Sequence, residues 1–460
     1  MSISNSSYGK DKIKELLKGG GRLHFVGASG AGMAPLAELC LMRGVSVSGS
    51  DIHPGEAYRR LTERGARLYP VHNADAVGDA AALVYSLAVS EDNEEIASAR
   101  KRGIPLISRA ELLGAISGEY SHSIGISGTH GKSTTVAMTS EIFSLAGRLP
   151  TVVSGATLSS GEPLLFGEGD CFIYEACEYR DSFLLTEPSV SVILNVELDH
   201  PDYFRSEDAL EKSFLAFALS ARDFALVNVD GASGRRIFSE LHGEKFSFGR
   251  TAFSDFRYRV EHSGVGRVDF SLYFKCCSLG NFTLNTIGGH FCEDAAAAVA
   301  TAYLMGISPQ TAREALLKYT GIARRLEPLG KVAGRSVFYD YAHHPTEISA
   351  VISAIKENFG KCTVIFRPHT YSRTEALWAD FVRTLKEADF VVLTDVFAAR
   401  ETEIEGVNST ALARAIGRRA TRLEPSQVGD YLLSSTEGAI VLMGAGDVED
   451  IKCELLKRKD

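Results

Sequence analysis

A glycine-rich segment that carries a lysine is the part of this sequence whose residues point most directly to chemistry. An apolar run, HSIGI, leads into SGTHGKST, and an amphipathic stretch follows. Gly128 and Gly131 let backbone N–H groups approach anionic oxygens, while the start of the helix adds partial positive charge. Lys132 brings a point charge for β and γ phosphates, and the Ser133 hydroxyl can bind Mg²⁺. The segment predicts a nucleoside triphosphate loop, although Ile126 replaces the first glycine of the GxxxxGK[ST] pattern; the alternative is a surface turn with an exposed lysine.

A second glycine-rich turn lies near the N-terminus, in HFVGASGAGM. Gly27, Gly30 and Gly32 follow an apolar run and precede a helical pattern. Asp51 ends the next apolar run, at about the distance where dinucleotide folds place a ribose-binding acid. The spacing is GxxGxG rather than GxGxxG, so it does not single out a nicotinamide cofactor. A nucleotide diphosphate, a nicotinamide cofactor and a turn with only a packing role all remain open.

Carboxylate and imidazole groups close the two apolar runs that follow the phosphate loop. Glu175 and Glu178 lie at the end of FIYEACE, and Asn195, Asp199 and His200 lie in LNVELDHPDYF. Parallel α/β sheets bind their ligands at the carboxyl ends of strands. A glutamate and a histidine at neighbouring strand ends could each bind a Mg²⁺ ion that neutralises a transferring phosphate. Solvated loop charges are the alternative.

Two strand ends in the last third of the chain carry imidazole and guanidinium groups. Such groups suit an anionic ligand or a polar amino acid, and helix capping or surface roles are the alternative. A zinc site is less expected, because no thiolate or carboxylate has companion spacing. The residues are Asp340, His343 and His344 in DYAHHPTEI, and Arg367, His369 and Arg373 in RPHTYSRTEAL.

Length and composition indicate several packed domains to position these groups. The chain has 460 residues, and at roughly one domain per ~150 residues it divides into about three. Its 45% apolar and 23% charged residues are typical of globular proteins, and its formal charge of -9 argues weakly against nucleic acid or an anionic membrane as partner. No apolar run is long enough to span a bilayer and no secretory h-region opens the chain, so we expect a cytoplasmic protein. The eight scattered cysteines should be reduced and mostly buried.

The order of apolar runs predicts an α/β protein of three domains. Strand and helix patterns alternate from residue 22 to 117, again after 122, and again after about 326, which indicates parallel sheets with helices on their faces. Residues 245–287 alternate in hydropathy and predict antiparallel strands added to the central core. We expect a Rossmann-like sheet in residues 1–119, a P-loop ATPase-like domain with added antiparallel strands in 120–325, and a Rossmann-like domain in 326–460.

Seven segments carry a resemblance that covers nearly the whole chain. In chain order, the sequence is similar to the Mur ligase family in GASGAGM, GISGTHGKSTT, EACEYRDSFL, NVELDHPDYF, GIARRLE, DYAHHPTEI and RPHTYSRT. GTHGKS and DYAHHP in this order are specific to the family, whereas the first glycine loop alone would not be. Members of the family have three domains that bind, in order, a UDP-sugar, ATP and the incoming amino acid.

The resemblance implies a reaction and its cofactors, ATP and Mg²⁺. The lactyl carboxylate of UDP-N-acetylmuramate would take a phosphoryl group from ATP, and the amine of L-alanine would attack the resulting acyl phosphate. Phosphorylation is needed because a carboxylate is a poor electrophile until one of its oxygens becomes part of a leaving group. UDP-N-acetylmuramate and L-alanine would then be the partners, in peptidoglycan precursor synthesis, with no obligate protein partner evident.

The resemblance also assigns the ATP and metal sites residue by residue. Asp340 would contact the ATP ribose, and Arg324 or Arg325, at the entry to the third domain, would reach the phosphates when the domains close. Ser133, Glu175 and His200 would hold magnesium. The remaining ATP contacts would come from Gly128, Thr129, His130, Gly131, Lys132, Ser133 and Thr134.

Substrate sites follow from the same resemblance. Around the alanine it places His344, His369 and Arg373. Together with Lys132, Glu175 and His200, it gives Arg324 and His344 catalytic roles. The glycine loop would hold the diphosphate of the UDP-sugar, in place of a nicotinamide, through Gly27, Ser29, Gly30, Gly32 and Asp51.

One departure from the family pattern falls near the expected adenine position. Where the family usually has two asparagines after the histidine of this motif, GGHFCEDAAAA has Phe291 and Asp294. Asp294 could still accept a hydrogen bond from the exocyclic amine of adenine. The alternatives are a recycling ligase that joins a tripeptide to the same UDP-sugar, a dehydrogenase built on the first domain, and a non-catalytic nucleotide-binding regulator.

Overall fold

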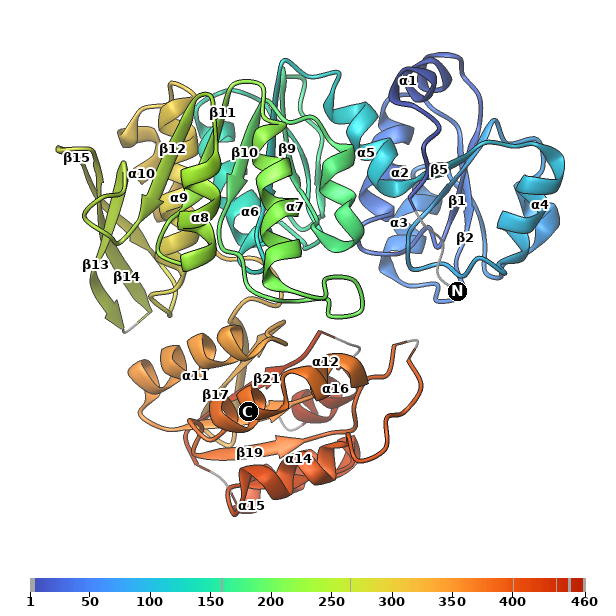
Figure 1. The fold of residues 1–460 in the computed structure, drawn as a ribbon. Coiled ribbons are helices and arrows are strands. Elements are labelled where there is room, and N and C mark those ends of the chain that lie inside the picture. Colours follow the sequence, from blue (N-terminus) through green and yellow to red (C-terminus); the bar gives the residue numbers. More distant parts are fainter. Residues whose placement is uncertain are drawn as a thin grey trace. The chain divides into compact units, whose positions relative to one another are not determined.

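A computed structural model describes residues 5–158, 160–264, 266–399, 401–435, 437–445 and 448–457 of the chain. The chain groups into two compact units, and it passes from one to the other several times. The first unit comprises residues 1–196, 208–256 and 297–312, and the second comprises residues 197–207, 257–296 and 313–460. Figure 1 labels elements of both units.

The N-terminal part of the first unit is a five-stranded parallel sheet in the order β3-β2-β1-β4-β5. The chain reverses its winding direction at β1, and the glycine loop follows this strand. In open α/β sheets such a reversal opens a crevice for ligands at the carboxyl ends of the strands. The strands are β1 (Leu23–Val26), β2 (Val47–Ser50), β3 (Arg67–Tyr69), β4 (Ala82–Tyr85) and β5 (Leu106–Ser108).

Helices flank this sheet, and local sequence signals set their ends (Figure 1). The side chain of Asn93 accepts hydrogen bonds from two backbone N–H groups at the start of α4, and Gly103 ends that helix with a φ of 69°. Ser108 caps the start of α5 in the same way. The elements are α1 (Lys10–Lys18), α2 (Ala34–Met42), α3 (Glu56–Glu63), η1 (Ala74–Val77), α4 (Glu94–Arg102) and α5 (Arg109–Ser117).

The central sheet of the first unit has the order β12-β11-β10-β6-β9-β7-β8. β6, which precedes the phosphate loop, lies between β9 and β10 and is parallel to both, so the ends of these strands flank the loop. The strands are β6 (His122–Ser127), β7 (Thr151–Val153), β8 (Leu164–Leu165), β9 (Cys171–Glu175), β10 (Val190–Ile193), β11 (Phe224–Asn228) and β12 (Lys245–Gly249).

The antiparallel region begins later than the sequence pattern indicates. β12 falls within the stretch that we expected to be antiparallel, yet it pairs in parallel with β11. The alternating sequence of β12 is typical of a strand with one exposed face, which led to the wrong prediction. In the structure three of its five residues are buried, as is typical of a strand in a parallel sheet. The strands after it, β13 (Phe256–Gly264), β14 (Arg267–Phe274) and β15 (Cys277–Leu284), include the expected antiparallel pairing of β14 with β15.

Helices also form in the middle of the chain. α7 (Glu207–Leu219) follows β10, and α9 (Phe291–Leu304) is rich in alanine. The others are α6 (Lys132–Leu145), η2 (Tyr179–Leu185), α8 (Ala232–Glu240) and α10 (Pro309–Lys318).

The C-terminal sheet of the second unit has the order β16-β17-β21-β18-β19-β20. All of its pairings are parallel except that of β16 with β17. The strands are β16 (Glu327–Val332), β17 (Arg335–Asp340), β18 (Cys362–Phe366), β19 (Phe390–Leu393), β20 (Ala420–Arg422) and β21 (Ala439–Met443).

Helices pack against this sheet and complete its buried core (Figure 1). They are α11 (Pro345–Phe359), α12 (Tyr371–Ala376), α13 (Trp378–Leu385), α14 (Ser409–Ile416), α15 (Pro425–Ser435) and α16 (Glu449–Leu456). The α/β fold class with N-terminal and C-terminal Rossmann-like sheets and a central P-loop ATPase-like domain is confirmed.

Two further expectations concern cysteines and membranes. All eight cysteines are free, as expected, but only four are buried, and Cys276, Cys277 and Cys453 are exposed. The expectation of mostly buried thiols is therefore wrong for half of them, because Cys276 and Cys277 lie at the turn between β14 and β15. In the described part of the chain, no helix combines the length and apolar character needed to cross a membrane.

Candidate functional site

The glycine loop after β1 is held by the end of the neighbouring strand β2. The backbone N–H groups of Gly27 and Ala28 donate to the carbonyl of Ser50, at 2.8 and 3.0 Å. One carboxylate oxygen of Asp51 accepts from the N–H of Ser29 at 2.8 Å, and the other accepts from the N–H of His53 at 2.9 Å. The predicted residues of this site therefore come together, with Asp51 shaping the loop.

Two positions of this loop favour glycine for different structural reasons. Gly27 has a φ of 71°, which favours glycine, whereas Gly32 packs against the side chain of Arg109. A Cβ on Gly32 would lie 3.2 Å from both Cδ and Nη1 of Arg109. Sequence reasoning missed Arg109, because it lies far from Gly32 in the sequence.

The phosphate loop after β6 is tied to the next strand by Asn195. Gly128 and Gly131 have φ values of 146° and 82°, and a Cβ on Gly128 would lie 3.0 Å from Cβ of Leu194. The side-chain carbonyl of Asn195 accepts from the N–H of His130 at 2.8 Å, and its amide donates to the carbonyl of His130 at 3.2 Å. Asn195, which lies at the end of an apolar run of the sequence, thus holds the loop in place.

Lys132 begins α6, and its ammonium group faces a buried carboxylate. Nζ lies 3.0 and 3.2 Å from the two carboxylate oxygens of Glu178 and also donates to the backbone carbonyls of Gly128 and Thr129. Although burial lowers the pKa of Lys132, the adjacent Glu178 outweighs this effect and raises it. The lysine is therefore charged and points back over its own loop, as a phosphate-binding lysine must.

The two glutamates at the end of β9 have different surroundings. Glu175 accepts from the Ser154 hydroxyl at 2.9 Å and from the Gly155 N–H at 2.6 Å. Glu178 lies just past the strand, at the start of η2, and is only 2% exposed. Sequence reasoning chose Glu175 for the metal, whereas Glu178 is the carboxylate in contact with Lys132.

In the second unit, Arg373 and His369 come together with Asp199 (Figure 1 labels α12, which carries Arg373). Nε and Nη2 of Arg373 donate to the Asp199 carboxylate at 2.9–3.2 Å, and Nη1 donates to Nδ1 of His369 at 3.0 Å. Both members of the ion pair are more than nine-tenths buried. Burial raises the pKa of Asp199, but the His200 and Arg373 charges hold it well below its usual range.

Two histidines beside this pair are neutral. Burial lowers the pKa of His369 to about 4, and the neighbouring Arg373 adds to this effect. Burial likewise lowers the pKa of His343 to about 3, although Glu347 opposes it. The two rings lie 6.1 Å apart, and His369 stacks on Phe397. Neutral rings can accept or donate hydrogen bonds to a polar ligand without adding charge.

His344 lies at the start of α11 and takes part in its capping. Its Nδ1 accepts from the N–H of Thr346 at 3.4 Å, while Glu347 closes a capping box. Nδ1 also lies 3.7 Å from the carboxylate of Glu197, and the Thr346 hydroxyl donates to the same group at 2.6 Å. Residues 197–207, which carry His200, therefore belong with the C-terminal sheet in the second unit.

A turn with unusual backbone geometry leads into the C-terminal sheet. Arg324 and Leu326 have φ values of 62° and 45°, which are uncommon for residues other than glycine. The carboxylate of Asp340 accepts from the N–H of Leu326 at 2.8 Å and from the N–H of Ala342 at 2.7 Å. Burial raises the pKa of Asp340 to about 6, while the charge of Arg325 limits the rise. Asp340 thus holds this turn in its strained conformation.

The guanidinium of Arg324 lies over aromatic rings rather than a carboxylate. It is 4.4 Å from the ring centre of Tyr341 and 5.3 Å from that of Tyr339. Its Nε and Nη2 atoms have no hydrogen-bond partner among the described residues. Of the two arginines that we considered, Arg324 has the donors available for an anion, because Arg325 pairs with Glu347.

The departure near the expected adenine position is also in the second unit. Phe291 packs on His290, with ring centres 4.2 Å apart. Burial and the nearby Arg325 lower the pKa of His290 to about 4. Asp294 is buried and raises the pKa of Arg325, so its carboxylate is compensated within the protein.

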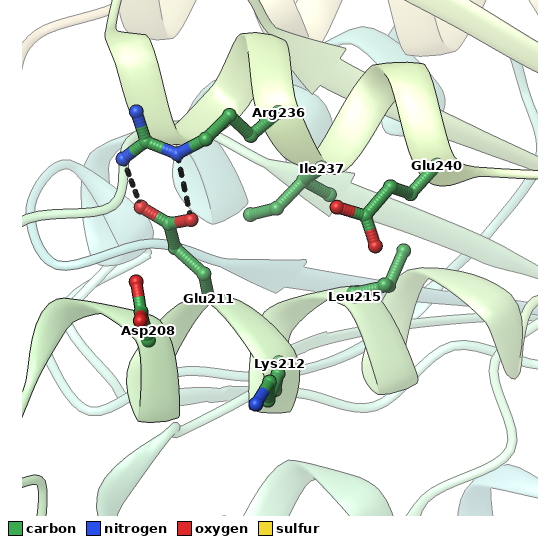
Figure 2. A pocket seen from close by; sticks show the side chains of 7 residues that line it. All are labelled: Asp208, Glu211, Lys212, Leu215, Arg236, Ile237 and Glu240. Atoms are coloured by element: carbon green, nitrogen blue, oxygen red, sulfur yellow. Dashed lines mark hydrogen bonds and ion pairs between the residues drawn. The ribbon is translucent and has the colours of Figure 1, made fainter.

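A pocket between α7 and α8 contains none of the predicted site residues. Figure 2 shows that Arg236 makes two hydrogen bonds to the Glu211 carboxylate within it. Its lining consists of Asp208, Glu211, Lys212, Leu215, Arg236, Ile237 and Glu240. We give this pocket no role in the chemistry.

Family models match three consecutive parts of the chain. The Mur ligase family catalytic domain matches residues 22–121, the Mur ligase middle domain matches residues 126–302, and the glutamate ligase domain of Mur ligases matches residues 324–448. Together with the fold and the two loops, and with curated relatives that match most of its length, these matches show that the chain belongs to the Mur ligase family.

Individual relatives narrow the comparison. The UDP-N-acetylmuramate–L-alanine ligase of Caldanaerobacter subterraneus is 36% identical over 441 residues, which cover 94% of this chain and 96% of that protein. The crystal structure of UDP-N-acetylmuramate-alanine ligase from Thermotoga maritima matches with a TM-score of 0.80 at 24% identity and covers 95% of this chain and 99% of the other. A murein peptide ligase from Psychrobacter arcticus matches with a TM-score of 0.72 at 21% identity, covering 95% and 98%. The two structures support the fold.

Proposed function

We propose that this protein is an ATP-dependent ligase that joins L-alanine to the lactyl carboxylate of UDP-N-acetylmuramate. The observation that carries the proposal is the phosphate loop, in which Lys132 points over Gly128 and Thr129, in a chain that shares 36% identity with a ligase of this name over 94% of its length. The reaction belongs to peptidoglycan precursor synthesis, and its substrates are cytoplasmic metabolites, which is where we place the protein.

The chemistry needs charge neutralisation before bond formation. A carboxylate oxygen takes the γ-phosphoryl group of ATP, which gives an acyl phosphate and ADP. The amine of L-alanine then attacks the acyl carbon, phosphate leaves with the bonding electrons, and the amine loses a proton. Lys132 offsets the negative charge that builds up as two anions meet. The Gly128–Thr134 segment supplies backbone donors to the same phosphates.

Magnesium fits the oxygen donors of the first unit. Mg²⁺ prefers carboxylate and hydroxyl oxygens, and the Ser133 hydroxyl and the Glu175 carboxylate are of this kind. We keep Ser133, Glu175 and His200 as proposed ligands and add Glu178, because its carboxylate already faces the phosphate-binding lysine. Bound there, the ion would neutralise phosphate oxygens during transfer.

The remaining assignments are proposals as well. The glycine loop with Asp51 would hold the UDP diphosphate. Asp340 would contact the ATP ribose when its carboxylate exchanges a backbone N–H partner for the ribose. His344, His369 and Arg373 would surround the alanine, and Arg324 would reach the phosphates. We propose functional domains in residues 1–119, 120–325 and 326–460, for the UDP-sugar, ATP and the amino acid.

Phosphate release from the purified protein tests this function. The assay contains Mg-ATP and UDP-N-acetylmuramate, and it compares L-alanine with L-serine, glycine and the tripeptide as acceptors. We expect release to be driven best by L-alanine and to require both substrates. Release driven only by the tripeptide would replace the proposal with the recycling activity, and release without either substrate would refute a ligase.

A further inference from the structure

Arg109 is a cation at the glycine loop that comes from elsewhere in the fold. It is the first residue of α5, and Ser108 fixes the helix start because its hydroxyl accepts from the N–H of Glu111 at 3.3 Å. The side chain packs on Gly32, where a Cβ would approach Cδ and Nη1 of the arginine at 3.2 Å. The α5 start thus delivers a guanidinium to the loop.

The loop itself carries no positive charge. Its segment, GASGAGM, contains no lysine or arginine, and the nearby charged group is the Asp51 carboxylate, which is already bonded to two backbone N–H groups. A diphosphate carries negative charge that backbone donors alone neutralise only partly. Tight binding at this loop therefore needs a cation from another element.

Arg109 differs from three other arginines of this part of the chain in having no acidic partner. Arg22, Arg43 and Arg60 pair with Asp79, Glu119 and Glu38. Arg67, Arg100 and Arg102 also lack an acidic partner among the described residues, but they are exposed. Among the residues that the structure describes, Arg109 has neither an ion-pair nor a hydrogen-bond partner, and it is half-buried. A guanidinium has five N–H donors in a planar fork that matches phosphate oxygens, so a half-buried one without a partner is suited to an anion.

We infer that Arg109 binds the diphosphate of the UDP-sugar at the glycine loop. This inference rests on the proposed function and adds a residue to its sugar-nucleotide site. The direct contact with Gly32 favours the diphosphate over the lactyl carboxylate as the anion, because the glycine loop is the phosphate-binding element of this sheet.

Direct binding without ATP tests the inference. The dissociation constants of UDP, UDP-N-acetylglucosamine and UDP-N-acetylmuramate are measured by calorimetry for the wild-type protein and for Arg109→Ala, Arg109→Lys and Arg43→Ala. We expect Arg109→Ala to weaken all three ligands by about 10- to 100-fold, the range of one charged hydrogen-bonded contact, and Arg109→Lys to recover part of this loss. Arg43→Ala, which removes a paired arginine of the same part, should stay within about twofold.

Three results would overturn the inference. Equal binding of the three ligands by Arg109→Ala and wild type would exclude a contact with the ligand. A loss confined to UDP-N-acetylmuramate would place Arg109 at the lactyl carboxylate instead. A wild-type protein that binds none of the three would refute the proposed function and this inference with it, whereas the first two results leave the function intact.

Folding of the variant is checked in the same preparation. Removing Arg109 leaves no buried acid without its partner, so the thermal midpoint of Arg109→Ala should remain within about 2 °C of wild type. A larger decrease, together with unchanged binding by the folded fraction, would indicate a structural role and overturn the inference.

Discussion

The glycine loop after β1 and the phosphate loop after β6 have the same strand–loop–helix plan but obtain positive charge in different ways. The phosphate loop contains its own cation, Lys132, which is paired with Glu178. The glycine loop contains none, and the guanidinium packed on it comes from α5. A cation within the loop moves with the backbone donors, whereas one from another helix depends on packing between elements. The first arrangement suits a reacting phosphate and the second suits a phosphate that is only held.

Removing Lys132 should give the largest difference between the functions of the two loops. Lys132→Ala is expected to lower phosphate release by about 1000-fold, because the transferring phosphoryl group loses its nearest fixed charge. Binding of UDP-N-acetylglucosamine should stay unchanged in the same protein. Normal turnover in Lys132→Ala would remove the phosphate loop from the mechanism.

The buried ion pair of Arg373 with Asp199 in the second unit differs from the pair of Lys132 with Glu178 in what each cation is expected to do. If Lys132 binds phosphate as proposed, it must exchange Glu178 for the phosphate, whereas Nε and Nη2 of Arg373 remain bound to Asp199 and Nη1 to His369. Arg373→Gln or Asp199→Asn alone should cost about 3 to 5 kcal/mol of stability in chemical denaturation, since each leaves a buried partner uncompensated.

The double variant decides what Arg373 binds. If Arg373 serves only as the partner of Asp199, the double variant Asp199→Asn/Arg373→Gln should have a free energy of unfolding no lower than that of the less stable single variant. If Arg373 serves the alanine carboxylate instead, Arg373→Gln should raise the KM for L-alanine while Asp199→Asn leaves it unchanged.

The side chains that clamp the two loops form a matched pair. Asn195→Ala should raise the KM for ATP by about tenfold, because it removes two hydrogen bonds that shape the phosphate loop. Asp51→Ala should raise the dissociation constant of the UDP-sugar to a similar extent. If each variant affected both ligands equally, the two loops would not act as separate sites.

Glycine substitutions compare the space at the loops. Gly128→Ala should destabilise the protein by about 2 kcal/mol, because its φ of 146° is unfavourable and its new Cβ would meet Leu194 and the backbone of Asn195. Gly32→Ala should cost less than about 1 kcal/mol, because only the flexible Arg109 side chain has to move. Thermal midpoints measure both, and the reverse order would contradict the packing described for Arg109.

The smallest effect is expected from pH, and it should come from the second unit. His290, His343 and His369 have pKa values lowered to about 4, 3 and 4, so below about pH 6.5 the unfolded chain binds protons that the native state does not. Asp340, with its raised pKa, acts in the opposite direction between about pH 6 and 4.

The net result is a loss of stability as the pH falls. We expect a decrease of about 1 kcal/mol in the free energy of unfolding from about pH 7.5 to 6.5, measured by denaturant titration. UDP-sugar binding at the glycine loop should be constant over this range, since its diphosphate does not titrate there. Stability that rises as the pH falls would contradict the neutral histidines.

Sequence reasoning recovered the fold class and both loops because their signals are local. A glycine that requires a positive φ, a lysine at a helix start and an apolar strand before them lie within one short segment. The roles of Glu178, Asn195 and Arg109 depend on which strands become neighbours and where strands end. β9 stops at Glu175, so Glu178 turns toward Lys132 at the start of η2, and alternation along the strand could not reveal that.

The error at β12 has a similar origin. Its residues, Lys245–Gly249, alternate like an antiparallel edge strand, but pairing with β11 decides its direction. Asp340 was placed correctly at a strand end, yet its engagement with the Leu326 and Ala342 amides follows from the strained turn, which composition does not indicate.

The repeated passage of the chain between the two compact units limits how the protein can be cut or rearranged. Each unit contains three separate stretches of sequence, so no single truncation yields either of them whole. A protease that cleaves near residue 313 would separate the C-terminal residues covalently from residues 197–207 and 257–296, which belong to the same compact unit. Nicked protein should therefore stay associated in solution, and reassembly from two co-expressed pieces is a more realistic engineering route than isolated domains.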